Sequence, residues 1–130
     1  MYAHASVAQD IADPARRIQL ALDEQGRIAG FCKLGLECRW PEHARGRRVI
    51  ELKQLYADPV RTGQGIGAAL MTWALGQAAA LGADEMQLSV WSENTGAQRF
   101  YGRYGFTRQA DIDFWVGEHR DHEYLFARLF

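Results

Sequence analysis

The sequence predicts a single α/β domain built on a mixed, mostly antiparallel sheet with helices on its faces. Its 130 residues are about the length of one domain. Hydrophobic residues make up 48% and charged residues 24%, as in globular proteins rather than disordered or fibrous ones. Strand-like and helix-like hydrophobic patterns follow one another in the order β-β-β-α-β-α-β-β, which indicates strands and helices packed in one unit.

The first half of the chain predicts three strands. Residues 1–16 show little periodicity and predict a loose N-terminal segment. Apolar and polar side chains alternate over residues 17–23, a turn follows, and residues 27–36 are apolar again, which indicates a β-hairpin. Residues 37–48 have no hydrophobic period and predict an exposed loop, and residues 49–57 predict the third strand.

The second half predicts two helices and three further strands. The glycine-rich run 62–67 opens a helix whose apolar residues recur at helical spacing, and Gly82 supplies its C-terminal stop. Residues 86–91 alternate like a strand, and Asn94 or Thr95 can cap the second helix. After that helix the pattern predicts two closing strands joined by a loop, at residues 106–116 and 123–129.

Charge and composition exclude several classes of function. Fifteen basic and sixteen acidic side chains give a net charge of -1, so no nucleic-acid partner is expected. No apolar stretch approaches the roughly 18 residues of a membrane helix and no signal-like segment follows Met1, so we expect a soluble, cytoplasmic protein. Cys32 and Cys38 specify neither a disulfide framework nor a zinc site, and His119 with His122 lacks a third ligand, so no metal is expected.

The segment from Arg61 to Gly67 joins a predicted strand to a helix N-terminus. Unpaired N–H groups and the positive end of the helix dipole favour a phosphate there, and the glycines leave the backbone accessible. Gly63, Gly65 and Ala68 also satisfy the G-x-G-x-x-[GA] pattern of dinucleotide-binding proteins. That alternative fails because the first glycine does not follow its strand directly and antiparallel hairpins precede the loop.

Two motifs together carry a resemblance to a known family. They are Pro59 with Gly63-Gln64-Gly65-Ile66-Gly67, and Asn94-x-x-Ala97-x-x-Phe100-Tyr101 with Gly105-Phe106. With both motifs at this separation, the chain resembles the GNAT superfamily of N-acetyltransferases over residues 17–130. The resemblance implies helices on both faces of the sheet, acetyl-CoA as cosubstrate, and transfer of its acetyl group to a primary amine.

The resemblance also implies where the cofactor binds. Thr62 stands where the family has a longer donor, with Arg61 one place earlier, and either side chain can reach a phosphate. The pantetheine arm is expected between strands 49–57 and 86–91, with a backbone N–H group facing the thioester oxygen. The residues assigned to acetyl-CoA are Leu55, Tyr56, Ala57, Arg61, Thr62, Gly63, Gln64, Gly65, Ile66, Gly67, Ala68, Asn94, Ala97 and Tyr101.

Two residues are candidates for proton transfer. Tyr101 matches the family's tyrosine near the cofactor sulfur and would protonate the leaving thiolate, the alternative being a core aromatic. Glu51 matches the general base of histone-type members, and strand alternation places it on one face with Lys53 and Leu55. A structural pair with Lys53 is the alternative for Glu51, and His43 in the arginine-rich loop is a rival base. Because neither cysteine matches a site position, we expect direct attack by the amine.

The acceptor is less defined. Five acids in residues 111–123 favour a cationic amine such as a polyamine, a lysine side chain or an aminoglycoside, and a solvated strand edge is the alternative. Family members usually have a strand and two helices before the hairpin that begins here near Arg17. We therefore expect a homodimer whose partner completes the acceptor groove, a truncated chain being the alternative. A non-catalytic acyl-CoA sensor and a protein-interaction module are the other functions considered.

Overall fold

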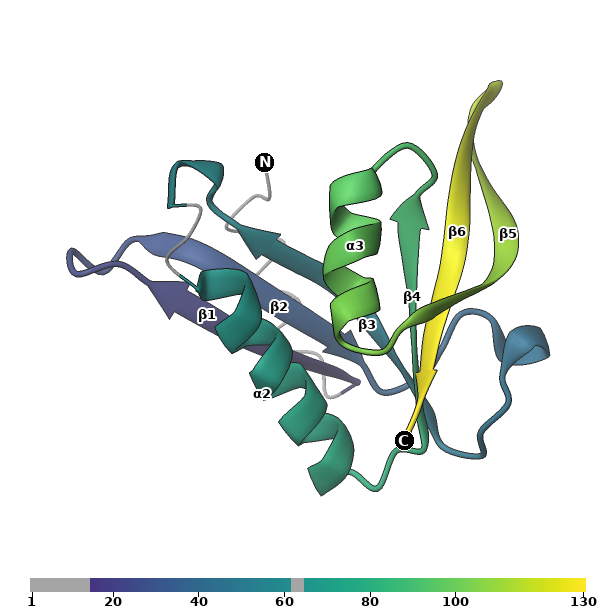
Figure 1. The fold of residues 1–130 in the computed structure, drawn as a ribbon, viewed down its shortest axis with the longest axis horizontal. Coiled ribbons are helices and arrows are strands. Elements are labelled where there is room, and N and C mark those ends of the chain that lie inside the picture. The colour runs from purple at the N-terminus through teal and green to yellow at the C-terminus, as the bar shows by residue number, and fades with distance from the viewer. Residues whose placement is uncertain (1–14, 62–64) are drawn as a thin grey trace.

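The structure, a computed structural model, describes residues 15–61 and 65–130 (Figure 1). These residues form one six-stranded sheet of order β1-β2-β3-β4-β6-β5, in which only β3 and β4 pair in parallel. The predicted mixed, mostly antiparallel sheet is therefore confirmed. The strands are β1 (Arg16–Leu22), β2 (Ile28–Gly35), β3 (Val49–Ala57), β4 (Glu85–Trp91), β5 (Thr107–Val116) and β6 (His119–Leu129).

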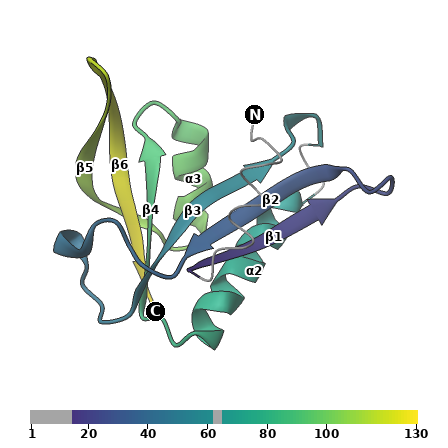
Figure 2. The same cartoon turned by 180° about the vertical axis from the view of Figure 1, so that it is seen from behind.

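Two α-helices pack on the sheet, α2 (Ile66–Ala80) and α3 (Thr95–Arg103). Both lie in front of the sheet in Figure 1 and behind it in Figure 2, so they cover the same face. The family resemblance implied helices on both faces; in the described part of the chain only this face carries α-helices. The predicted N-terminal segment lies outside the described residues except at its end. No helix in the described ranges is long and apolar enough to cross a membrane.

The core lies between α2 and the central strands. Leu70 and Ala74, at the predicted helical spacing, are buried together with Met71 and Ala78. They pack on a continuous apolar layer because β2, β3 and β4 are joined side by side and present their alternate residues to the same face. The strand residues of this layer are Cys32, Leu34, Ile50, Leu52, Met86, Leu88 and Val90.

The helix boundaries follow from local chemistry. Asn94 caps α3, as predicted, because its side-chain oxygen accepts a hydrogen bond from the Ala97 N–H at 3.0 Å. Gly82 and Gly105 follow the two helices with φ of 68° and 86°, the left-handed conformation that favours glycine after a helix. The stop predicted at Gly82 is confirmed.

A β-bulge in β3 changes which residues share a face. Lys33 pairs with Gln54 and Leu34 pairs with Leu52, so Lys53 is an extra residue without an opposite partner in β2. Leu52 and Leu55 consequently both contribute to the core beneath α2. The prediction that Glu51 and Leu55 share a face was wrong, because strict alternation does not hold across the extra residue.

The β5–β6 hairpin is tighter than predicted. Val116 pairs with His119, so a turn through Gly117, with φ of 62°, joins the strands directly. We expected a loop through His122 because residues 119–122 are polar. They form strand nevertheless, because they pair with β5 in a hairpin that projects beyond the rest of the sheet (Figure 1). His119 and Arg120 are exposed there.

Candidate active site

The two parallel strands at the centre of the sheet separate after three residue pairs. β3 and β4 are joined from Val49–Glu85 to Glu51–Gln87, and each strand then continues without the other. Figure 1 shows them diverging, with α3 in front of the opening. Beyond Glu51 the edge of β3 that faces β4 therefore has no strand partner, and its backbone groups can pair with an extended ligand.

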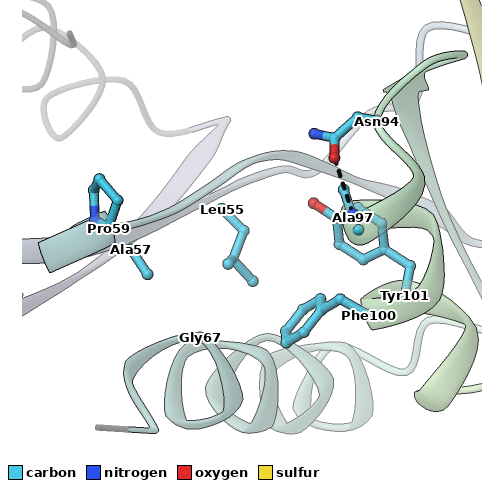
Figure 3. Close-up of a pocket in the computed structure, with 9 residues that line it drawn as sticks. Leu55, Ala57, Pro59, Gly67, Asn94, Ala97, Phe100 and Tyr101 are labelled. Atoms are coloured by element: carbon cyan, nitrogen blue, oxygen red, sulfur yellow. Dashed lines mark hydrogen bonds between the residues drawn. The ribbon is translucent and has the colours of Figure 1, made fainter. Parts of the chain in front are cut away.

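A cleft of about 560 Å³ occupies this opening. Small-molecule sites commonly measure roughly 300–1,000 Å³, so the cleft can hold a substantial part of a cofactor. Figure 3 shows its lining side chains converging from β3 above, α2 below and α3 at one end. The lining residues are Leu55, Ala57, Pro59, Gly67, Asn94, Gly96, Ala97, Phe100 and Tyr101.

The N-terminus of α2 lies at the cleft. Gly67, in the first turn, lines it, and a Cβ at Gly67 would lie 3.5 Å from the Phe100 ring. Gly65 caps the helix with φ of 73°, and nothing in the described part of the chain lies within 4 Å of where its Cβ would be. Because glycine has no side chain to cap the first N–H groups, this helix end is open to an anion.

Tyr101 reaches into the cleft from α3. Its ring packs edge-on against Phe100 and Phe106, with centroids 5.5 and 6.1 Å away. Figure 3 shows the hydroxyl directed toward β3. Burial, with a smaller effect of the nearby Cys32 thiol, raises the pKa of Tyr101 to about 12. The phenol is therefore neutral near pH 7 and can donate a hydrogen bond.

Neither cysteine is poised as a nucleophile. Cys32 is fully buried in β2, and burial raises the pKa of its thiol to about 12. Burial also raises the pKa of Cys38, whose neighbourhood includes the carboxylates of Glu51 and Glu85. Both cysteines are free thiols. Since the thiolate is the reactive form, this arrangement favours direct transfer over an acyl-cysteine intermediate.

Six of the residues assigned to acetyl-CoA from the sequence line the cleft: Leu55, Ala57, Gly67, Asn94, Ala97 and Tyr101. Tyr56 does not, since its ring packs on Phe31 at 5.6 Å and 41% of the residue is exposed. Ile66 packs against the core and Ala68 is exposed on α2. Arg61 ends a short 3-10 helix, and Thr62, Gly63 and Gln64 lie outside the described residues.

Three lining residues had no predicted role. Pro59 lies two residues after the end of β3, and its place in the family motif was the signal for it. Phe100 lies three residues after Ala97, on the same side of α3, so helical spacing could have indicated it. Gly96 lies in the first turn of that helix, where the missing side chain leaves room beside Asn94.

Glu51 is fully buried on the face of the sheet away from α2. Its Oε1 accepts a hydrogen bond from the Arg39 backbone N–H at 3.1 Å, and its Oε2 accepts one from Arg39 Nε at 2.9 Å. Arg39 Nη2 lies 2.8 Å from Oε2, and Lys53 Nζ lies 3.7 Å from Oε1. The pair with Lys53 forms as predicted, but Arg39 is the nearer partner, and this geometry favours an anchoring role for Glu51.

The arginine-rich segment 37–48 is anchored in the same way at its other end. Glu85 is fully buried in β4, and its Oε1 accepts hydrogen bonds from the backbone N–H groups of Arg45 and Gly46 at 2.7 and 2.9 Å. A Cβ at Gly46 would clash with the Asp84 carboxylate, which accepts hydrogen bonds from the backbone of Arg47 and Arg48, so a larger residue would disturb this anchor. The rival base His43 lies exposed between these anchors, in the 3-10 helix Pro41–His43.

Three acids of the β5–β6 hairpin have basic side chains beside them. Asp111 pairs with Arg108, and Asp113 pairs with Arg120 at 3.0 Å. Asp121 Oδ1 lies 2.8 Å from His119 Nε2. His119 is one of the two histidines considered above for a metal site. In residues 15–61 and 65–130 no group of three or more metal-binding side chains gathers. Charge pairing across the hairpin therefore favours the solvated-edge interpretation over attraction of a cationic acceptor.

Comparison with known proteins points to one family. The model of the acetyltransferase (GNAT) family matches residues 2–106. An uncharacterized N-acetyltransferase of Mycobacterium tuberculosis is 37% identical over 125 residues, which cover 95% of this chain and 74% of that protein. A mycothiol acetyltransferase of Clavibacter michiganensis subsp. michiganensis is 37% identical over 107 residues, which cover 82% of this chain and 31% of that protein.

Solved structures agree with this assignment. Nourseothricin acetyltransferase superimposes with a TM-score of 0.74 and 26% identity, over 90% of this chain and 66% of that one. The PaiA N-acetyltransferase from Thermoplasma acidophilum, solved in complex with coenzyme A, has a TM-score of 0.71 and 20% identity, over 97% and 68% of the two chains. At that identity the second comparison shows a shared fold alone. With the family match across most of its length, this chain belongs to the GNAT family of acetyltransferases.

Proposed function

We propose that this protein transfers an acetyl group from acetyl-CoA to a primary amine by direct attack in a ternary complex. The observation that carries the proposal is the cleft at the opening between β3 and β4. Acetyl-CoA combines a diphosphate, an arm with two amides and a thioester. The cleft offers a helix N-terminus, an unpaired strand edge and a neutral phenol, which suit these three parts.

Different parts of the cofactor bind to α2, to β3 and to α3. The diphosphate binds the loop Gly63–Gly67 and the N-terminus of α2, with Arg61 and Thr62 as donors. The pantetheine arm pairs with β3 along Leu55–Ala57, and a backbone N–H there stabilises the thioester oxygen as it gains charge. Asn94 uses its side-chain oxygen to cap α3, which leaves its Nδ2 for the cofactor arm.

The chemistry needs a donor for the departing sulfur. The amine nitrogen attacks the thioester carbon, the new C–N bond forms, and the C–S bond breaks to release CoA. Tyr101 donates a hydrogen bond to the sulfur as it leaves. Because a pKa of about 12 lies well above the roughly 8.5 of a thiol, this hydrogen bond stabilises the thiolate without requiring complete proton transfer.

The acceptor must lose a proton before or during attack. Arg39 occupies both carboxylate oxygens of Glu51, so we assign the proton to water in the first instance. Glu51 as general base stays a prediction, and the Glu51→Gln variant separates the two possibilities. The two free thiols favour a reducing, cytoplasmic compartment. We also propose that the protein is a homodimer, as expected from the sequence.

The proposed function is tested by thiol release from acetyl-CoA with a panel of amines. An N-acetyltransferase releases thiol only when both acetyl-CoA and an accepted amine are present, and the acetylated amine appears in equal amount. An acyl-CoA sensor would be stabilised against thermal unfolding by acetyl-CoA but release no thiol with any amine. A protein-interaction module would show neither effect.

A further inference from the structure

We propose that the acceptor amine also carries an anionic group, a carboxylate or another oxyanion, which Arg39 and Lys53 bind on the face of the sheet away from the helices. The inference rests on the proposed function, because it names the substrate class of the same reaction. It replaces the cationic acceptor that the acidic hairpin suggested.

Lys53 lies where the sheet opens. The pair Glu51–Gln87 is the last between β3 and β4, and Lys53 follows it two residues later. The bulge directs the Lys53 side chain over Gly35, because a Cβ at Gly35 would lie 2.6 Å from Lys53 Cε. Gly35 is the register partner of Glu51 in β2, so Lys53 and Glu51 share the face away from α2. The ammonium group therefore lies beside the Glu51 carboxylate, on the face of the sheet away from the cofactor cleft.

Arg39 is held in place next to it. Its Nε and Nη2 contact Glu51, and its guanidinium lies over the rings of Trp40 and Phe114, 4.5 and 5.4 Å from their centroids. Even so, 45% of the side chain stays exposed. A planar guanidinium fixed on one edge and open on another is preorganised to bind an oxyanion.

The charges around these two residues favour an anion. Arg39 and Lys53 share the single carboxylate of Glu51, so the three groups together remain positive. The pKa of Lys53 is lowered, first by burial; the Glu51 carboxylate raises it, and the positive charges of Arg39, Arg16 and Lys33 lower it further. The other buried carboxylate on this face, Glu85, is occupied by Arg45 and Gly46. A bound oxyanion would offset the repulsion that Lys53 experiences.

Two unpartnered acceptors on the same face match the amine. In the described part of the chain, Gln54 Oε1 and Gln87 Oε1 are the buried side-chain polar atoms without a hydrogen-bond partner. Gln54 follows Lys53 on β3, and Gln87 is the register partner of Glu51 on β4. Buried carbonyl oxygens are nearly always satisfied in proteins, and the N–H groups of an amine are suitable partners. The anion-binding cations thus lie beside acceptors for N–H groups.

The test compares amines that differ only in the group at the far end. Amino acids with a terminal amine and three to five carbons are each assayed beside the alkylamine and the diamine of equal length, with saturating acetyl-CoA. We expect kcat/KM to be at least about tenfold higher for the anionic amine than for the neutral one, and lowest for the diamine. Raising the salt concentration should narrow the difference, because screening weakens exposed charges.

Three variants assign the preference to residues. Lys53→Gln should reduce the preference for the anionic amine several-fold, because kcat/KM should fall more for the anionic amine than for the neutral one. Arg39→Lys keeps a positive charge near Glu51 but loses the planar guanidinium. It should also reduce the preference for the anionic amine, and it leaves the buried Glu51 carboxylate with a charged partner. Arg47→Gln removes an equal charge from the exposed far end of the same segment and should leave the preference unchanged.

Each remaining outcome decides one of the two proposals. Equal or reversed preference, or failure to acetylate any anionic amine although acetyl-CoA stabilises the protein, would overturn the anionic acceptor and leave the proposed function standing. An unchanged preference in both Lys53→Gln and Arg39→Lys would also overturn it. If acetyl-CoA neither stabilises the protein nor supports thiol release, the proposed function falls and this inference falls with it.

Discussion

Burial at Tyr101 changes the chemistry that its motif suggests. A phenol with a pKa near 10 would be close to a thiol near 8.5, and proton transfer between them would be only mildly unfavourable. In the structure the pKa rises to about 12, mainly through burial. The motif predicted that Tyr101 lines the cleft, but the shift of its pKa depends on burial in the folded protein and on the Cys32 thiol, which comes from β2. The sequence therefore predicted the position of Tyr101 but not the pKa of its hydroxyl.

Replacing Tyr101 by Phe removes the donor and keeps the ring. We expect kcat to fall by about 10²-fold, within the usual range for loss of a proton-donating side chain, with acetyl-CoA affinity changed less than about twofold. Tyr104→Phe is the matched control, because Tyr104 packs on the same Phe100 ring but does not line the cleft. An unchanged kcat in Tyr101→Phe would assign this side chain to packing.

Alkaline pH should destabilise the protein through two buried groups. The pKa values of Cys32 and Tyr101 rise to about 12 in the folded state. Their unfolded values are about 8.5 and 10, so the stability they contribute is complete below those values and is lost as pH rises toward 12. Urea unfolding should show stability falling from about pH 8.5 in wild type, less steeply between about pH 8.5 and 10 in Cys32→Ala, where only Cys38 remains, and less steeply above about pH 10 in Tyr101→Phe. Identical pH slopes in all three proteins would contradict this.

At the scale of elements, the features that sequence reasoning missed depend on pairing between distant segments. Residues 49–57 were predicted as a strand with the correct bounds, but the extra residue at Lys53 is defined only by the register with β2. Segment 37–48 has no hydrophobic period, and nothing local shows that its arginines meet Glu51 and Glu85. Anchoring by buried carboxylates is a tertiary property, whereas caps and stops such as Asn94 and Gly82 are local and were predicted.

Glu51→Gln tests whether this residue anchors Arg39 or removes the acceptor's proton. The substitution keeps the shape and removes the charge, so hydrogen bonds to Arg39 should weaken and stability should fall by about 1.5–3 kcal/mol in urea unfolding. The acidic limb of the pH-rate profile should keep its position. Glu42→Gln, exposed in the same segment, should change stability by less than about 0.5 kcal/mol. A flattened acidic limb with unchanged stability would instead identify Glu51 as the base.

At the scale of the whole molecule, the order of strands and helices was predictable because hydrophobic periods change sharply along the chain. The placement of both α-helices on one face was not, since the amphipathic pattern of a helix does not say which side of a sheet it covers. The β5–β6 hairpin was misjudged for the opposite reason. Residues 119–122 are all polar and begin at the exposed end of the hairpin, so they give no hydrophobic alternation to detect.

A homodimer remains a prediction at this scale. In the described residues β1 and β5 form the two edges of the sheet, and edge strands of soluble proteins are commonly paired or protected. Sedimentation equilibrium at micromolar concentration should therefore give twice the monomer mass. A monomer under these conditions would contradict the dimer and leave the catalytic proposal untouched.

The most direct test of the account is stabilisation by acetyl-CoA in Gly65→Asp and Gly82→Asp. Both glycines have positive φ, and both flank α2, at opposite ends, with nothing in the described chain near the added Cβ. At about 100 times Kd, acetyl-CoA should raise the free energy of unfolding by about 2.7 kcal/mol in wild type. We expect the same gain in Gly82→Asp and almost none in Gly65→Asp, where the carboxylate meets the diphosphate. An equal gain in all three proteins would contradict binding of the cofactor at the N-terminus of α2.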